Sequence, residues 1–335
     1  QMLPPEAGVA WIRRELTAGT SDREVIVAGT LGMMAGEYDD RGGVDADRLV
    51  GDRDARGPMI GEVGVSVHDG IVVETTLDPV RQPFLNDHRI DGKPVLPGVM
   101  GMEAFAEAAR LLAPDHRVVA VEDVTFAAPL KFYRDEPRTL TVQAVIRPAG
   151  DDLVAECRLS ADRLLPGSET PQRTVHFTGR VRLSRSSTAD EHVDPAPQPT
   201  GPSLDPDQVY SFYFHGPAYQ VVGSAWNGGG VSVTELAEPL PANHEPDGLP
   251  LTIAPRLVEL CFQTAGLWQA GRDDRLALPM QVGSARVIGD PSSVDGGLQA
   301  RATEIEPGVF DCIVTDAAGS VVVRLDGYRT IPLPT

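Results

Sequence analysis

The feature that most constrains this chain is a pattern that occurs twice: strand-like runs, one apolar helix, then more strand-like runs. The two predicted helices cover residues 98–112 and 255–270. The first carries apolar side chains at helical spacing, and the second is apolar on most sides. One buried helix among antiparallel strands predicts a curved sheet wrapped around that helix. Two such units of similar size predict a pseudo-duplicated α+β fold.

Segments rich in Gly, Pro, Ser and Asp divide the chain. We expect one linker at residues 37–54, which are acidic and Gly-rich, and another at 184–207, which lack any periodicity. The repeated units then cover residues 55–183 and 208–335. Residues 1–36 indicate a short helix and a strand, too little to enclose a core, so we expect the tail of a preceding domain.

Composition excludes several classes of partner. The net charge of −19 over 335 residues argues against binding to nucleic acid or to anionic membranes. No apolar stretch is long enough to cross a bilayer and no leader sequence is evident, which predicts a cytoplasmic protein. The three scattered cysteines, Cys157, Cys261 and Cys312, fit neither a disulfide framework nor a zinc site, and no close metal-ligand spacing occurs. We therefore expect no metal.

A histidine lies on a constrained loop just before the first predicted helix. His88, Gly92 and Pro97 have the spacing H-x3-G-x4-P. The glycine permits a tight turn and the proline stiffens the entry into the helix. Because histidine is the side chain best suited to move protons near neutral pH, we interpret His88 as a candidate base.

A candidate acid lies on the second predicted helix. Glu259 and Gln263 are four residues apart and therefore share one face. Their neighbours are apolar nearly all round, which predicts that the carboxyl group is buried. Burial would raise the pKa of Glu259, as suits a general acid.

Three segments resemble the dehydratase domains of polyketide and polyunsaturated fatty-acid synthases, most of all the iterative enediyne type. The His88 segment matches the motif HxxxGxxxxP. Residues 213–220 (YFHGPAYQ) resemble YGPxFQ, with His215 where tyrosine is usual, so the role of that tyrosine is not transferred. Residues 254–263 resemble HPxLLDxxxQ, with Ala254 in place of His and Glu259 in place of Asp. The resemblance runs from about residue 54 to the C-terminus, and residues 1–36 resemble the end of a ketoreductase domain.

The resemblance implies a double hot-dog fold, in which two curved antiparallel sheets each wrap around a central helix. It implies the dehydration of a 3-hydroxyacyl thioester carried on the phosphopantetheine of an acyl carrier protein, without another cofactor. His88 would be the base and Glu259, assisted by Gln263, the acid. The residues expected to contact substrate are Gly92, Pro97, Gly98, Tyr213, His215, Gly216 and Pro217.

The expected partners are the carrier protein and other domains of the same synthase, with a homodimer also open. Since the chain is acidic overall, a small cationic rim of Lys93, Lys131 and Arg134 is our candidate for carrier docking. Two alternatives remain at this point: a product-template-like cyclase with the same fold, and a non-catalytic structural or docking module.

Overall fold

The computed structural model describes residues 56–66, 70–163, 170–186, 188–288 and 297–332, together with residues 8–9, 12–13 and 16–17. The chain divides into two units, residues 1–49 and 50–335. Apart from those six residues, the predicted tail (1–36) and the first linker (37–54) lie outside the described part. The fold set out below is that of the second unit.

The first half of this unit is six antiparallel strands around the helix α4 (Gly98–Leu112). The helix is buried along almost its whole length, as its Ala-rich, apolar sequence predicts. The strands lie in the order β1-β2-β6-β7-β8-β5. Their bounds are β1 (Glu62–Ser66), β2 (Gly70–Leu77), β5 (Arg117–Phe126), β6 (Arg138–Ala149), β7 (Asp152–Arg163) and β8 (Gln172–Ser184).

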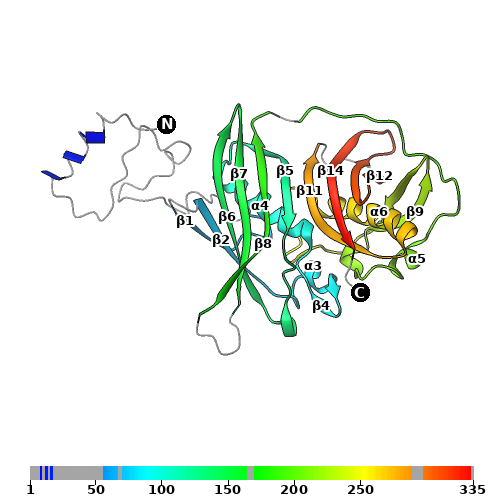
Figure 1. Ribbon diagram of the computed structural model, residues 1–335, viewed down its shortest axis with the longest axis horizontal. Coiled ribbons are helices and arrows are strands. Elements are labelled where there is room, and N and C mark those ends of the chain that lie inside the picture. The colour runs from blue at the N-terminus through cyan, green and yellow to red at the C-terminus, as the bar shows by residue number, and fades with distance from the viewer. Residues whose placement is uncertain are drawn as a thin grey trace. The chain divides into compact units, whose positions relative to one another are not determined.

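The second half repeats the arrangement around α6 (Pro255–Asp273). Its strands lie in the order β11-β14-β13-β12-β10-β9, all antiparallel. Their bounds are β9 (Val222–Gly228), β10 (Val231–Leu236), β11 (Ala277–Val287), β12 (Gln299–Glu306), β13 (Val309–Thr315) and β14 (Val321–Pro332). Two helices, each wrapped by its own strands, confirm the double hot-dog fold (Figure 1).

The two halves share one sheet. β5 pairs with β11, so that Val124 lies opposite Val282 and Thr125 opposite Gln281, and Figure 1 shows these strands side by side. The described strands of the two halves, apart from the separate pair β3 and β4, therefore form a continuous 12-stranded sheet, where the sequence led us to expect two separate ones. Backbone hydrogen bonds across this pair fix the position of one half relative to the other.

Six short elements of the described chain lie in the loops that connect the longer helices and strands. They are α3 (Pro83–Asn86), β3 (Arg89–Ile90), β4 (Lys93–Pro94), η3 (Tyr133–Asp135), α5 (Pro206–Tyr210) and η4 (Pro217–Tyr219). The predicted linker at 184–207 follows the second half closely: His192 pairs with Ser320, and Leu204 pairs with Ala225. The exact domain boundaries stay predictions. None of the described helices is long and apolar enough to cross a membrane.

Two buried carboxyl groups on α4 hold neighbouring segments. Glu103 is fully buried and accepts hydrogen bonds from the backbone N–H groups of Thr252, at 2.5 Å, and Ile253, at 2.9 Å. These residues precede α6, which has no side-chain cap of its own because Ala254 stands at its N-cap. Glu107, one turn further along α4, accepts from the backbone N–H of Met59. Glu103 therefore links the core of the first half to the start of the helix in the second.

We predict that Glu107→Gln stabilises the fold more at alkaline than at acidic pH. Burial, followed by the charge of Glu103, raises the pKa of Glu107 well above its ordinary value. The stabilising contribution of the protonated group is therefore complete below the unfolded-state pKa and is lost as pH rises through the folded-state pKa. A glutamine still accepts from Met59 but cannot ionise, so the free energy of unfolding of the variant should rise relative to that of wild type as pH increases through the folded-state pKa. Urea unfolding at several pH values measures this.

The matched control is Glu103→Gln, one turn away on the same helix. It replaces one of two carboxylate acceptors by an amide donor, which should cost about 1–3 kcal/mol at acidic as well as at neutral pH. A Glu107→Gln variant that loses as much stability as Glu103→Gln would contradict the assigned protonation.

Candidate active site

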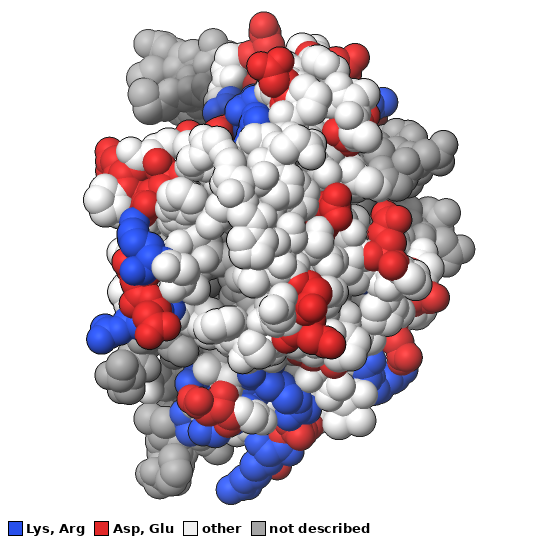
Figure 2. All heavy atoms as spheres, turned by 90° about the vertical axis from the view of Figure 1, so that its right-hand side faces the viewer, with Lys and Arg blue, Asp and Glu red and all other residues white. Residues whose placement is uncertain are grey.

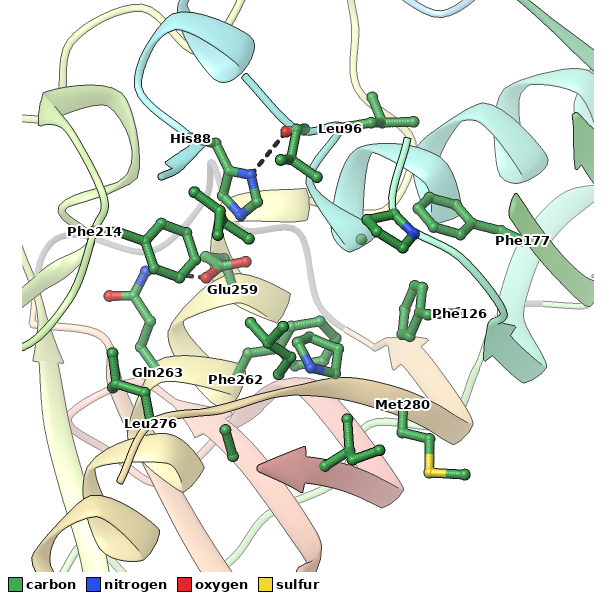
Figure 3. A pocket seen from close by; sticks show the side chains of 18 of the residues that line it. His88, Leu96, Phe126, Phe177, Phe214, Glu259, Phe262, Gln263, Leu276 and Met280 are labelled. Carbon is green, nitrogen blue, oxygen red and sulfur yellow. Dashed lines mark hydrogen bonds between the residues drawn. The ribbon is translucent and has the colours of Figure 1, made fainter. Parts of the chain in front are cut away.

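His88 follows α3 and faces the cavity between the two halves (Figure 3). Its Nδ1 lies 2.8 Å from the carbonyl oxygen of Val95. Since a carbonyl oxygen only accepts, Nδ1 carries the proton and Nε2 is left as a free base. The backbone N–H of Val95 in turn donates to the His88 carbonyl oxygen at 2.9 Å. These two hydrogen bonds close the loop onto itself and fix the orientation of the imidazole ring.

The surroundings of His88 favour its neutral form. Its side chain lies among the rings of Phe214, His215 and Tyr219, with centroids 5.2, 5.3 and 6.2 Å away. Burial, followed by the positive charge of His215, lowers the pKa of His88 to about 4, although Glu259 acts in the opposite direction. The ring is therefore unprotonated at neutral pH and able to take up a proton.

Glu259 and Gln263 face the same cavity from α6. The Nε2 of Gln263 donates to Oε1 of Glu259 at 3.0 Å and to the carbonyl oxygen of Tyr219, also at 3.0 Å. The hydroxyl of Tyr210 donates to Oε1 of Gln263 at 2.9 Å. Gln263 is thus held in one orientation, and it holds the carboxyl group in turn.

His215 is the other partner of the acid. Its Nε2 lies 3.3 Å from Oε1 of Glu259, and both side chains are less than a tenth exposed. Burial acts to raise the pKa of Glu259, but the hydrogen bond from His215 and the charges of His215 and His88 outweigh it and lower this pKa below its ordinary value. The expectation that burial would set a raised pKa was wrong, because the buried carboxyl group has close donors.

A clasp between two loops brings His88 and His215 together. The two residues form an antiparallel backbone bridge. Beside it, the Asp87 carbonyl accepts from the N–H of Gly216, and Oδ2 of Asp87 accepts from the N–H of Ala218, both at 2.7 Å. A Cβ at position 216 would lie only 2.8 Å from Oδ1 of Asp87, so a glycine is needed for this approach. Asp87 therefore connects the loop of His88 in the first half to the loop of His215 in the second.

The cavity itself is a largely apolar chamber of about 470 Å³. Phe126 packs edge-on against Phe177 with centroids 5.2 Å apart. These rings lie across the cavity from His88, Glu259 and Gln263, which together form its polar end (Figure 3). The other residues along its walls include Ile90, Val95, Leu96, Phe262, Leu276, Leu278, Met280 and Ile331.

The expected substrate contacts divide into two sets. Gly98, Tyr213 and His215 line the cavity, whereas Gly92, Pro97, Gly216 and Pro217 do not. Contact of these four residues with substrate stays a prediction, and their described interactions lie in the loops around the cavity. Gly92 has a φ of +72° in the turn between β3 and β4, and Pro97 stands at the N-cap of α4. Gly216 belongs to the clasp with Asp87, and Pro217 begins η4.

The residues predicted to dock a carrier protein lie close to one another. β4, which contains Lys93, contacts η3, which contains Arg134, and Lys131 pairs with Val95 on the cavity wall. Lys93 and Arg134 are exposed. On the face that Figure 2 shows, Lys and Arg side chains lie mainly toward the edge of a broad uncharged surface.

Sequence reasoning missed Tyr210, Asp87 and the aromatic wall. Asp87 stands directly before His88, and an acidic residue beside the candidate base was a usable signal. Nothing in the sequence indicates that Tyr210 reaches Gln263, 53 residues away. No cluster of three or more potential metal ligands occurs among the described residues.

We predict that the imidazole of His88 titrates near pH 4, far below the ordinary value of 6.5. The physical reason is the burial of the ring beside His215. Nitrogen-15 NMR of the imidazole groups, with a His88→Gln variant to assign the signals, measures this midpoint. A midpoint near 6.5 would show that the ring is hydrated and that the geometry above does not hold in solution.

Comparison with known proteins identifies the family to which the chain belongs. The profile described as the polyketide synthase dehydratase domain matches residues 58–157, and the profile described as the polyketide synthase dehydratase N-terminal domain matches residues 188–335. Polyketide synthase ThaG of Burkholderia thailandensis is 25% identical over 262 residues, which are 75% of this chain and 4% of that protein. The pikromycin synthase component PikAII of Streptomyces venezuelae is 25% identical over 292 residues, 83% of this chain and 7% of that protein. The chain thus spans a small part of these relatives.

Solved structures agree with the fold. A trans-AT dehydratase domain from Brevibacillus brevis superposes with a TM-score of 0.69 at 19% identity, covering 84% of this chain and 100% of that one. The dehydratase domain of PpsC from Mycobacterium tuberculosis gives a TM-score of 0.64 at 24% identity, covering 83% and 99%. With both profiles in chain order over most of unit 50–335, this chain belongs to the dehydratase domains of polyketide synthases.

Proposed function

We propose that this domain removes water from a 3-hydroxyacyl thioester carried on the phosphopantetheine arm of an acyl carrier protein, giving a 2-enoyl thioester. The observation that supports it most is the meeting of His88 and Glu259, one from each half of the fold, in a single apolar cavity. A base and an acid at the same end of such a cavity can act on adjacent carbons of one substrate.

His88 is the base in this proposal. Its Nδ1 donates to Val95, so the lone pair of Nε2 is free to take the proton from C2 of the substrate. The lowered pKa keeps the ring neutral until it reacts. In the first turn of α4, the N–H groups of Met100 and Gly101 donate to the Pro97 carbonyl. The N–H groups of Gly98 and Val99 have no acceptor among the described residues and can polarise the thioester carbonyl as C2 loses its proton.

Glu259 delivers the proton to the departing hydroxyl. Gln263 and His215 both meet its Oε1, and no described residue hydrogen-bonds to Oε2, which leaves Oε2 for the substrate. The bond between C3 and oxygen breaks as the double bond between C2 and C3 forms. The reaction requires no cofactor beyond the carrier's arm.

The alternatives have less support. A cyclase must hold many carbonyl oxygens of a polyketo chain, yet the walls beyond the polar end are apolar. A purely structural module would not need a base and a buried acid around one cavity. The wider context remains part of the proposal: an iterative synthase of the enediyne type, located in the cytoplasm, with neighbouring synthase domains and a second copy as further partners. The sequence motif around His88 supports the synthase type.

We predict that His88→Ala and Glu259→Gln each lower kcat by about 100-fold or more, since each removes a proton-transfer group. Glu259→Asp should keep part of the activity, because it restores the acid that is usual at this position. Incubation with 3-hydroxyacyl carrier protein, followed by mass spectrometry for the loss of water, measures this. Dehydration by His88→Ala at the wild-type rate would refute the assigned base.

We also predict a role for the cationic rim. Reversing the charges of Lys93 and Lys131 to Glu should raise KM for a carrier-bound substrate, and more so at low salt, because the attraction to an acidic carrier is lost. Turnover of a small pantetheine thioester should be unaffected. An equal loss with both substrates would instead indicate damage to the His88 loop, and the docking role would be withdrawn.

A further inference from the structure

The Glu259 carboxyl group lies in surroundings where a lone charge is costly. It is 5% exposed, and no Lys or Arg occurs among the described residues that line the cavity. A buried carboxylate needs a cationic partner or must take up a proton. Among the described residues, the side chains that act on Glu259 and are able to carry a positive charge are His88 and His215.

Of the two histidines, only His215 can fill this role before the reaction starts. The Nδ1–H of His88 donates a hydrogen bond to the Val95 carbonyl, and the ring is neutral at neutral pH. His215 has its Nε2 3.3 Å from Oε1 of Glu259 and is 7% exposed. One proton placed on either side chain, the carboxyl group or the imidazole, would leave the pair without net charge.

We propose that His215 and Glu259 act together as the general acid, with His215 holding the proton that Glu259 passes to the leaving hydroxyl. This rests on the dehydratase function proposed above, and it gives the histidine that replaces the usual tyrosine a role of its own. His215 acts through Glu259, so it is a positioning and proton-storing residue.

The charges balance through the reaction. The C2–H bond breaks and its proton goes to Nε2 of His88, while its electron pair forms the C2=C3 bond. The C3–O bond breaks, and the hydroxyl leaves as water with the proton of the pair. His88 is then a cation and Glu259 an anion in the same cavity, so the site as a whole gains no charge. Return of the proton from His88 to the pair restores the starting state.

The rest of the His215 ring is enclosed by the protein. Nδ1 of His215 is buried without a hydrogen-bond partner among the described residues. Because Nδ1 keeps its hydrogen whether the shared proton lies on Nε2 or on the carboxyl group, this missing partner does not favour one placement over the other. The ring stacks on Phe214, with centroids 4.4 Å apart. The other titratable groups that act on Glu259 or His215 are His88, Tyr210, Tyr213, Tyr219 and Tyr328, and the charged Arg256 lies beyond Tyr219.

The test compares His215→Gln with wild type across pH. Glutamine can still donate to Glu259 but cannot carry the proton, so Glu259 must hold it alone. We expect kcat to fall by about 100-fold at about pH 8 and by tenfold or less at about pH 5.5, where the carboxyl group is more often protonated. His215→Tyr, a second variant that also donates but stays neutral, should show the same pH dependence. The double variant with Glu259→Gln should be no slower than Glu259→Gln alone.

Each other outcome overturns the inference. A wild-type rate and pH profile in His215→Gln would show that His215 holds no proton for the reaction. An equal loss at both pH values, or additive losses in the double variant, would show that His215 only packs the site. An exposed-histidine control, His192→Gln, should match wild type. Wild-type protein that does not dehydrate the substrate at all would instead refute the proposed function itself.

Discussion

Burying an ionisable carboxyl group in an apolar cavity costs several kcal/mol unless hydrogen bonds and an opposite charge compensate it. Around Glu259 this compensation comes from residues of several segments. Gln263 donates from the same helix, His215 donates from the loop before η4, and Tyr210 orients Gln263 from α5. The carboxyl group thus draws the segments of the second half into one arrangement. The same carboxyl group acts on His88, the base in the first half, and its charge favours the protonated form of that ring.

Division of the site between two halves makes their alignment a catalytic requirement. An error of about 1 Å between base and acid can cost a large part of the rate. Three features described above limit such an error: the pairing of β5 with β11, the Asp87 clasp and the Glu103 carboxyl group before α6. Each uses backbone hydrogen bonds across the interface, which restrict direction as well as distance. The alignment therefore depends on groups that take no part in the chemistry.

The sequence was enough to predict the two central helices, because their apolar pattern is local: the first was expected at 98–112, as α4 is, and the second at 255–270, close to α6. It also placed His88, Glu259 and Gln263 at one site. The joining of the sheets through β5 and β11 was not predictable, since strand pairing over about 160 residues leaves no local pattern. The lowered pKa of Glu259 was missed for a related reason. Burial can be inferred from neighbours in sequence, but the donor His215 comes from 44 residues away.

Three departures from the usual dehydratase motifs can now be connected to physical features of the site. Glu259 extends the acid by one methylene, and His215 replaces a neutral phenol by a group that can carry charge. A longer side chain brings Oε1 to His215 and Gln263 together while leaving Oε2 toward the cavity. Ala254 removes a side chain at the N-cap of α6, where Glu103 from α4 binds the preceding backbone N–H groups. The first two changes bear on one proton, and at the third the backbone before the helix is held by Glu103 from the other half of the fold. Helix position and proton placement are therefore set by different residues, so the acid can change chemically without shifting the backbone that supports it.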